Sequence, residues 1–142
     1  MHIAFALFAD AANLSQEGKL NILGVFDALH VGALPAVHPR AMLVLRLKGG
    51  RGDVGTHGLR LEWFNPTGAE LWASEGELNV TAPPAGVTEM DMPIIAALDL
   101  PIDRAGEYTL RVAIDDDLKA AVPLQVRSAE QPMGPIVSGM VS

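Results

Sequence analysis

The chain has 142 residues, which is enough for one domain with a substantial hydrophobic core and too few for two. Hydrophobic residues make up 49% of the chain, which excludes a disordered protein. The lack of cysteine excludes disulfide scaffolds, cysteine-ligated zinc sites and thiol nucleophiles, and the formal net charge of -7 disfavours binding to nucleic acid.

The first predicted strand covers residues 3–9, which are apolar on both faces. The start of the chain lacks the positive segment of a signal peptide, and Asp10 ends the apolar run, so we expect a soluble, cytoplasmic protein. No apolar run approaches the roughly 20 residues that span a bilayer. Between Asp10 and Lys19 we expect an interruption, with Asp10 capping one helical turn and Gly18 ending it in the left-handed conformation.

Strand character resumes from residue 20 to residue 29, where Gly24 interrupts the run and suggests a bulge. The proline-punctuated stretch 32–40 is predicted to be a fixed, extended crossover rather than a flexible linker. Residues 49–55 are predicted to be a flexible, glycine-rich loop. Before that loop, residues 41–48 form the clearest early strand, with three leucines facing the core: Leu43, Leu45 and Leu47.

The second half of the chain repeats the alternation of apolar and polar residues. Strands are expected at 57–64, 70–80, 92–100, 108–115 and 120–126. The turn at residues 65–68 has proline early and glycine late, and Gly76 is expected to break the strand that follows it. Pro93 and Pro123 lack an amide donor, so Pro93 is expected at the start of its strand or on an exposed edge, and Pro123 where its strand lies at a sheet edge.

Tyr108 opens the most regular of these strands, since its side chain falls on the same face as the next three apolar residues. The entry Gly106-Glu107-Tyr108 resembles the penultimate strand of immunoglobulin-like sandwiches, where a tyrosine hydroxyl bonds back to the preceding loop. We therefore expect Tyr108 to be a buried structural corner whose hydroxyl bonds to the backbone between Asp103 and Gly106.

These elements amount to roughly eight short strands with turns between them and no convincing long helix. They predict an all-β fold, an immunoglobulin-like β-sandwich of two antiparallel sheets, with a closed barrel as the alternative. The sandwich domain is expected to cover residues 1–127, and residues 128–142 form a C-terminal tail.

The first third of the chain also carries a family resemblance. It opens with Asp10-Ala-Ala-Asn13-Leu-Ser15 and Gly18-Lys19-Leu20-Asn21-Ile22 and continues with Pro35-Ala-Val37-His38-Pro39-Arg40. The turn at residues 65–68 and the closing Gly106-x-Tyr108 extend the pattern. Over about residues 3–127 the chain resembles a bacterial family of uncharacterised proteins, a domain of unknown function. The resemblance implies an immunoglobulin-like β-sandwich and carries no activity.

Polar residues gather in the first hairpin and the crossover that follows it. The candidate ligand-binding residues are Asp10, Asn13, Lys19, Asp27, His38 and Arg40. Together they could form a ligand or metal site at one end of the sandwich, but the same residue types commonly bond backbone groups in irregular loops. Convergence of the two aspartates, the histidine and the arginine in a concave pocket would separate these interpretations.

No metal, cofactor or catalytic site is predicted. The four histidines lack the spacing of zinc ligands, and the sequence has neither a Gly-x-Ser-x-Gly nor a Walker pattern. The acidic turn Asp115–Asp117 fits either a solvated hairpin turn or a calcium site, although the regular spacing of a calcium loop is absent.

The tail carries the predicted interface. Its last ten residues have no charge and include Ile136, Val137, Met140 and Val141, which are apolar and need a cover. The predicted protein is therefore not an enzyme and acts through contacts with a protein partner or with itself, without nucleic acid, membrane or cofactor. The alternative is a small-ligand or metal-binding domain, or an enzyme, with its site at the first hairpin and the Pro35–Arg40 crossover.

Overall fold

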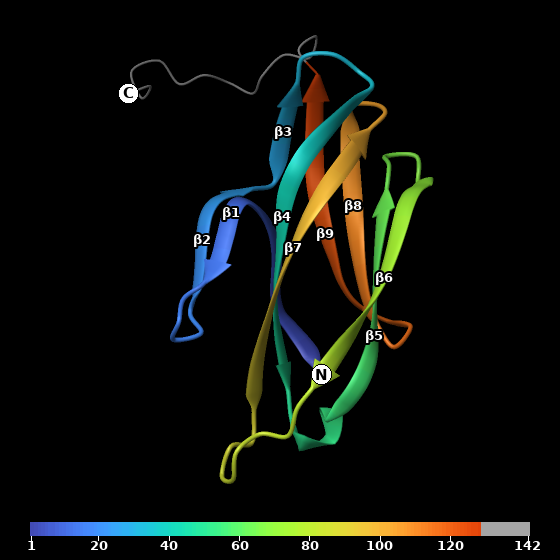
Figure 1. The fold of residues 1–142 in the computed structure, drawn as a ribbon. Coiled ribbons are helices and arrows are strands. Elements are labelled where there is room, and N and C mark those ends of the chain that lie inside the picture. Colours follow the sequence, from blue (N-terminus) through green and yellow to red (C-terminus); the bar gives the residue numbers. More distant parts are fainter. Residues whose placement is uncertain (129–142) are drawn as a thin grey trace.

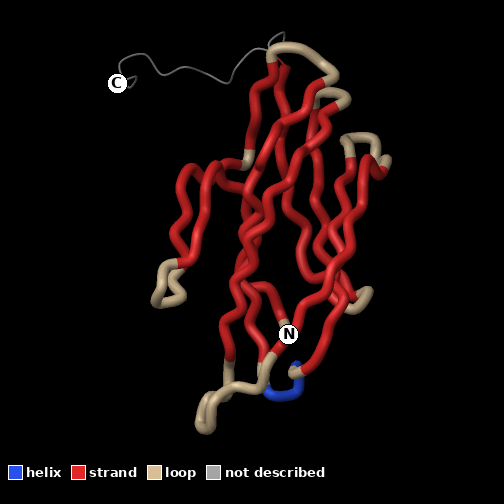
Figure 2. Tube along the Cα trace, in the orientation of Figure 1, coloured by secondary structure: helices blue, strands red, loops and turns tan. Residues whose placement is uncertain are grey.

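Runs of alternating apolar and polar residues build nine strands in the computed structural model, which describes residues 1–128 (Figure 1). Figure 2 shows strands throughout, joined by short loops and one turn of 3-10 helix at Arg51–Asp53. Among the described residues, no helix is long and apolar enough to cross a membrane. The strands are β1 (His2–Leu14), β2 (Leu20–Phe26), β3 (Ala28–Val31), β4 (Ala36–Gly49), β5 (Gly55–Phe64), β6 (Glu70–Val80), β7 (Met90–Ile102), β8 (Gly106–Ile114) and β9 (Asp117–Ser128).

The strands form two sheets. One has four strands in the order β2-β1-β4-β7, and the other has five in the order β3-β9-β8-β5-β6. Neighbouring strands are antiparallel, apart from β3 and β9, which pair in parallel from Ala28↔Gln125 to Val31↔Ser128. The predicted all-β, immunoglobulin-like sandwich is confirmed, and the barrel alternative is wrong because the described strands form two separate sheets.

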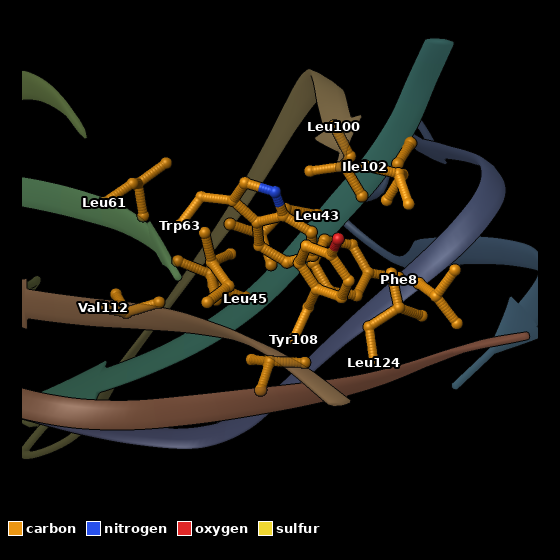
Figure 3. Packing of buried hydrophobic residues seen from close by; sticks show 14 residues of the cluster. Phe8, Leu43, Leu45, Leu61, Trp63, Leu100, Ile102, Tyr108, Val112 and Leu124 are labelled. Atoms are coloured by element: carbon orange, nitrogen blue, oxygen red, sulfur yellow. The ribbon is translucent and has the colours of Figure 1, made fainter. Parts of the chain in front are cut away.

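The inward faces of both sheets share one core, in which large side chains interdigitate (Figure 3). The rings of Trp63 and Tyr108 stack with their centroids 5.1 Å apart, and Phe8 meets Trp63 edge-on at 6.2 Å. Neither Trp63 nor Tyr108 has any exposed surface, and Trp63 Nε1 donates a hydrogen bond to the carbonyl of Pro101 at 2.9 Å. The core also contains the predicted inward leucines Leu43 and Leu45, and Leu47 is equally buried.

Tyr108 makes the predicted corner. Its hydroxyl accepts hydrogen bonds from the backbone N–H groups of Asp103 and Arg104, each at 3.0 Å. The hydroxyl proton has two acceptors within reach, Asp103 Oδ1 at 2.6 Å and the Arg104 carbonyl at 2.7 Å. The hydrogen bond from Tyr108 lowers the pKa of the Asp103 carboxyl below its ordinary value. The corner thus fixes the loop that joins the two sheets through β7 and β8.

The helical turn predicted at Asp10 is wrong. Asp10 lies within β1, because the strand continues to Leu14 with β2 as its partner. A short turn at residues 15–18 then reverses the chain, and Gly18 has the predicted left-handed conformation (φ +80°). Gly24 also has a positive φ of +72°, but the register of β1 and β2 does not shift there, so the expected bulge is absent from this hairpin.

The predicted crossover is largely strand, since β4 begins at Ala36 and pairs with β7 from there. Within β4 the register shifts between His38 and Ala41, where Arg40 adopts a positive φ of +52°. Gly76 does not break β6, which runs without interruption.

Both strand prolines occupy edges, as predicted. Pro93 lies on β7, whose outer flank is the edge of the four-stranded sheet. Pro123 lies on β9 ahead of the segment that pairs with β3, which begins at Gln125, so the flank of β9 is open at the proline. At an open edge, the missing N–H group of proline does not remove a hydrogen bond between strands.

Candidate interaction surface at the first hairpin

The first hairpin extends beyond the sandwich as a two-stranded arm, which we define as residues 10–25. β1 pairs with β4 only as far as Ala9, whereas its pairing with β2 continues to Leu14. Figure 1 shows β1 bending away from β4 and running beside the sandwich together with β2. Within the arm, the two strands therefore have only each other as hydrogen-bonding partners in the described ladders.

The tip of the arm is built by Ser15 and Gly18. The Ser15 N–H donates to the Lys19 carbonyl at 2.9 Å, and the Gly18 N–H donates to the Ser15 carbonyl at 3.0 Å. The Ser15 hydroxyl accepts a further bond from the Lys19 N–H at 3.1 Å. Behind the tip, Asn21 Nδ2 donates to Asn13 Oδ1 across the strands at 2.9 Å. These bonds satisfy the turn locally, as serine and glycine commonly do.

The base of the arm requires a glycine. The carboxyl group of Asp10 lies over Gly24, and a Cβ atom at residue 24 would collide with Asp10 Oδ2 and approach its Cγ to 2.9 Å. Gly24 also holds a φ of +72°, which side-chain-bearing residues rarely adopt. The positive φ of Gly24 and the Asp10 side chain above it both disfavour a larger residue where the arm leaves the sandwich.

A groove of about 550 Å³ separates the arm from the outward face of the four-stranded sheet. The arm contributes Gly18, Lys19, Leu20 and Ile22, and the sheet contributes Phe5, Arg46, Asp91 and Pro93. The outward position of Phe5 follows from the register, because it pairs with Arg46 after a shift that follows Ile3. The walls of the groove are thus largely apolar, with charged groups beside them.

The charges at the groove are paired. Arg46 holds Asp91 through two bonds, Nη2 to Oδ2 at 2.8 Å and Nε to Oδ1 at 3.2 Å. Lys48 adds a contact to Asp91 at 3.1 Å, and these partners lower the pKa of Asp91 to about 2. On the arm, Lys19 Nζ lies 3.1 Å from Glu17. The groove consequently offers apolar contact without an unpaired charge among these five side chains.

The arm also exposes large apolar side chains. Leu14 is 47% exposed, Val25 60% and Leu23 73%. Leu23 and Val25 alternate with Ile22 along β2, so they lie on the face of the strand opposite Ile22. Exposed apolar side chains gathered on one face typically mark an interaction surface, and Leu23 and Val25 share such a face.

The structure distributes the six candidate ligand residues along the hairpin and the start of β4. Asp10, Asn13 and Lys19 belong to the arm, and Lys19 alone lines the groove. In the part of the chain that the structure describes, no hydrogen bond or ion pair joins Asp10, Asp27, His38 and Arg40 to one another.

Each of the last three instead has a local contact. The Asp27 carbonyl accepts a hydrogen bond from the Gln125 N–H at 2.9 Å. The ring of His38 lies edge-on to Phe26 with centroids 5.6 Å apart. The Arg40 N–H donates to Asp99 Oδ1 at 3.0 Å, which caps the irregular point of β4.

Sequence reasoning missed a pairing at the opposite end of the sandwich, between His57 and the acidic turn. His57 Nδ1 lies 2.6 Å from Asp115 Oδ2, and Nε2 lies 2.6 Å from the carbonyl of Asp53. Both ring nitrogens face acceptors, and the bond to Asp115 is the main cause that raises the pKa of His57. Asp115 Oδ1 also accepts the Gly58 N–H at 2.9 Å. This contact depends on the pairing of β5 with β8, which brings His57 beside Asp115, and the sequence pattern does not encode that pairing.

No metal centre is formed within residues 1–128, where no three histidine or acidic side chains are arranged to hold an ion. The predicted interface residues Ile136, Val137, Met140 and Val141 lie outside the described residues.

Comparison with known proteins gives a family and a distant structural likeness. The sequence profile of a family of unknown function (DUF6941) matches residues 4–127. A crystal structure of an immunoglobulin-like protein from Pseudomonas aeruginosa is 16% identical, with a TM-score of 0.33, over 89% of this chain and 95% of that one. The comparison with curated proteins finds no match.

Proposed function

Since the chain belongs to this family of unknown function, its role has to be inferred from its own surface, and we propose that it is a non-catalytic protein that acts through protein contacts. The observation that carries the proposal is the arm, which concentrates three large exposed apolar side chains on a ribbon of two strands. We propose that the arm mediates self-association.

The physical basis is that such a two-stranded ribbon has little stability on its own. A two-stranded hairpin is at best marginally stable in water, because it buries little apolar surface. Beyond Ala9 the arm lacks the third strand that β4 provides to the rest of β1. Its free flanks offer unpaired backbone groups, and Leu23 and Val25 offer apolar area, so a second molecule would satisfy both needs.

The state of His57 supports a role without catalysis. A histidine that acts as a general base needs a free nitrogen for a proton, whereas both nitrogens of His57 face oxygen acceptors within 2.6 Å. We propose that the protein acts in the cytoplasm. The proposal is supported by the apolar residues 3–9, which pair with β4 within the fold.

Light scattering coupled to gel filtration tests the proposal. We expect the wild type to show a mass above the 15.0 kDa of one chain, rising with concentration. The double variant Leu23→Ser/Val25→Ser should move it towards one chain. Leu118→Ser is the matched control, because Leu118 is also exposed (56%) but lies next to the β8–β9 turn. A wild type that runs as a single chain at every concentration contradicts self-association.

A further inference from the structure

The groove between the arm and the sheet is open and needs an occupant of a particular kind. Its volume of about 550 Å³ lies within the range of roughly 300–1,000 Å³ that is typical of binding sites. Phe5, Leu20, Ile22 and Pro93 supply apolar walls. The nearby charges are already paired, Arg46 with Asp91, so an uncharged segment can enter without separating an ion pair.

The chain itself contains such a segment. Residues 133–142 carry no charge, and Ile136 and Val137 form its most apolar pair. β-branched side chains suit an extended backbone, which a narrow groove beside a sheet requires. Pro135 immediately before the pair favours the same extended conformation for residue 134.

The length of chain after Ser128 decides which molecule supplies the segment. Ser128 ends β9 at the top of Figure 1, where β4 begins, whereas Arg46 lies ten residues further along β4. That separation is about 33 Å at 3.3 Å per residue. Val137 follows Ser128 by nine residues and reaches at most about 32 Å when fully extended. The segment must also pass from one sheet to the outward face of the other, roughly 10 Å away. The extended tail therefore falls short of the groove of its own molecule.

We propose that Ile136 and Val137 of a second copy occupy the groove between the arm and the sheet. The inference rests on the proposed self-association and identifies one of its contacts: the tail of one molecule lies against the arm of another. Because each copy has one groove and one tail, the exchange can be reciprocal and close a dimer.

Cysteine cross-linking tests this directly, since the chain has no cysteine of its own. Lys19→Cys marks the groove at an exposed position, and Val137→Cys marks the tail. The two full-length variants are prepared separately, mixed and oxidised, so that their mixed disulfide joins two molecules. Leu118→Cys with Val137→Cys is the control pair. A bound tail raises the local thiol concentration, so we expect the groove pair to exceed the control on the order of tenfold.

Different results test the tail contact and the proposed self-association. Equal yields from the two pairs overturn the tail contact, even if Leu23→Ser/Val25→Ser still lowers the mass of the wild type. An intramolecular disulfide in the double variant Lys19→Cys/Val137→Cys, at the mass of one chain, overturns the assignment to a second copy. A wild type that is a single chain throughout overturns the proposed function as well. In the full chain, Val137→Asp should lower the mass, and an unchanged mass contradicts the proposal.

Discussion

Replacing Tyr108 by phenylalanine isolates the hydroxyl of the corner from its ring. The ring has no exposed surface and stacks on Trp63, so phenylalanine preserves its packing. The hydroxyl, however, accepts two backbone N–H groups and has its own acceptors on Asp103 and Arg104. The variant therefore removes one oxygen and leaves several polar groups without a partner.

The magnitude follows from those groups. Leaving a buried partner unsatisfied costs about 1–3 kcal/mol, and the exposed side of this loop allows water to replace part of the loss. With a urea m-value of about 2 kcal/mol/M, the free energy of unfolding should fall enough to move the midpoint by roughly 0.5–1.5 M.

Urea denaturation followed by tryptophan fluorescence measures this shift, because Trp63 lies against the substituted ring. Thr56→Val is the control, since it removes an exposed hydroxyl that donates to Asn79 at 2.8 Å and should leave the midpoint nearly unchanged. A midpoint for Tyr108→Phe that equals the wild-type value would refute the energetic role of the corner.

Three further outcomes are expected. The bond to Asp115 raises the pKa of His57, so the stability that His57 contributes is complete below the ordinary value of 6.5 and is lost as pH rises through the raised value. Thermal unfolding measured across pH 5–9 should show this loss, and His57→Gln should abolish the pH dependence. Gly24→Ala should lower the free energy of unfolding by at least about 1 kcal/mol through its positive φ and its clash with Asp10, and Asp10→Ala in the same chain should restore only the steric part, as measured by urea denaturation. Calcium or zinc should leave the melting temperature unchanged, since Asp115 already bonds His57 and Gly58; a large increase reversed by a chelator would contradict this expectation.

The sequence predicts the strands well where a local pattern dictates the structure. Alternation around Leu43 and Tyr108 reports which face is buried, because side chains alternate between the faces of every strand. Pro93 and Pro123 report edges for an equally local reason, the missing N–H group. The helical turn predicted at Asp10 failed because pairing with β2, a tertiary contact, overrode the capping tendency of aspartate.

The candidate surface was only partly accessible to sequence reasoning. Lys19 is one of the candidate residues that the sequence indicates, and it lines the groove, but Phe5 and Asp91 come from strands whose pairing no local pattern encodes. The groove exists because β1 departs from β4 at Ala9. The apolar run of residues 3–9 does end at Asp10, where the departure begins, but a polar residue does not by itself indicate that a strand changes its partner.

The parallel pairing of β3 with β9 has a consequence for how the protein is made. Ala28 pairs with Gln125, so the two register partners are 97 positions (125 − 28) apart in the sequence. Contacts of such long sequence separation slow folding, because the chain entropy of closing the loop is lost before the contact forms. During synthesis β3 therefore stays without its partner until β9 has left the ribosome, so the five-stranded sheet gains its β3 edge only then.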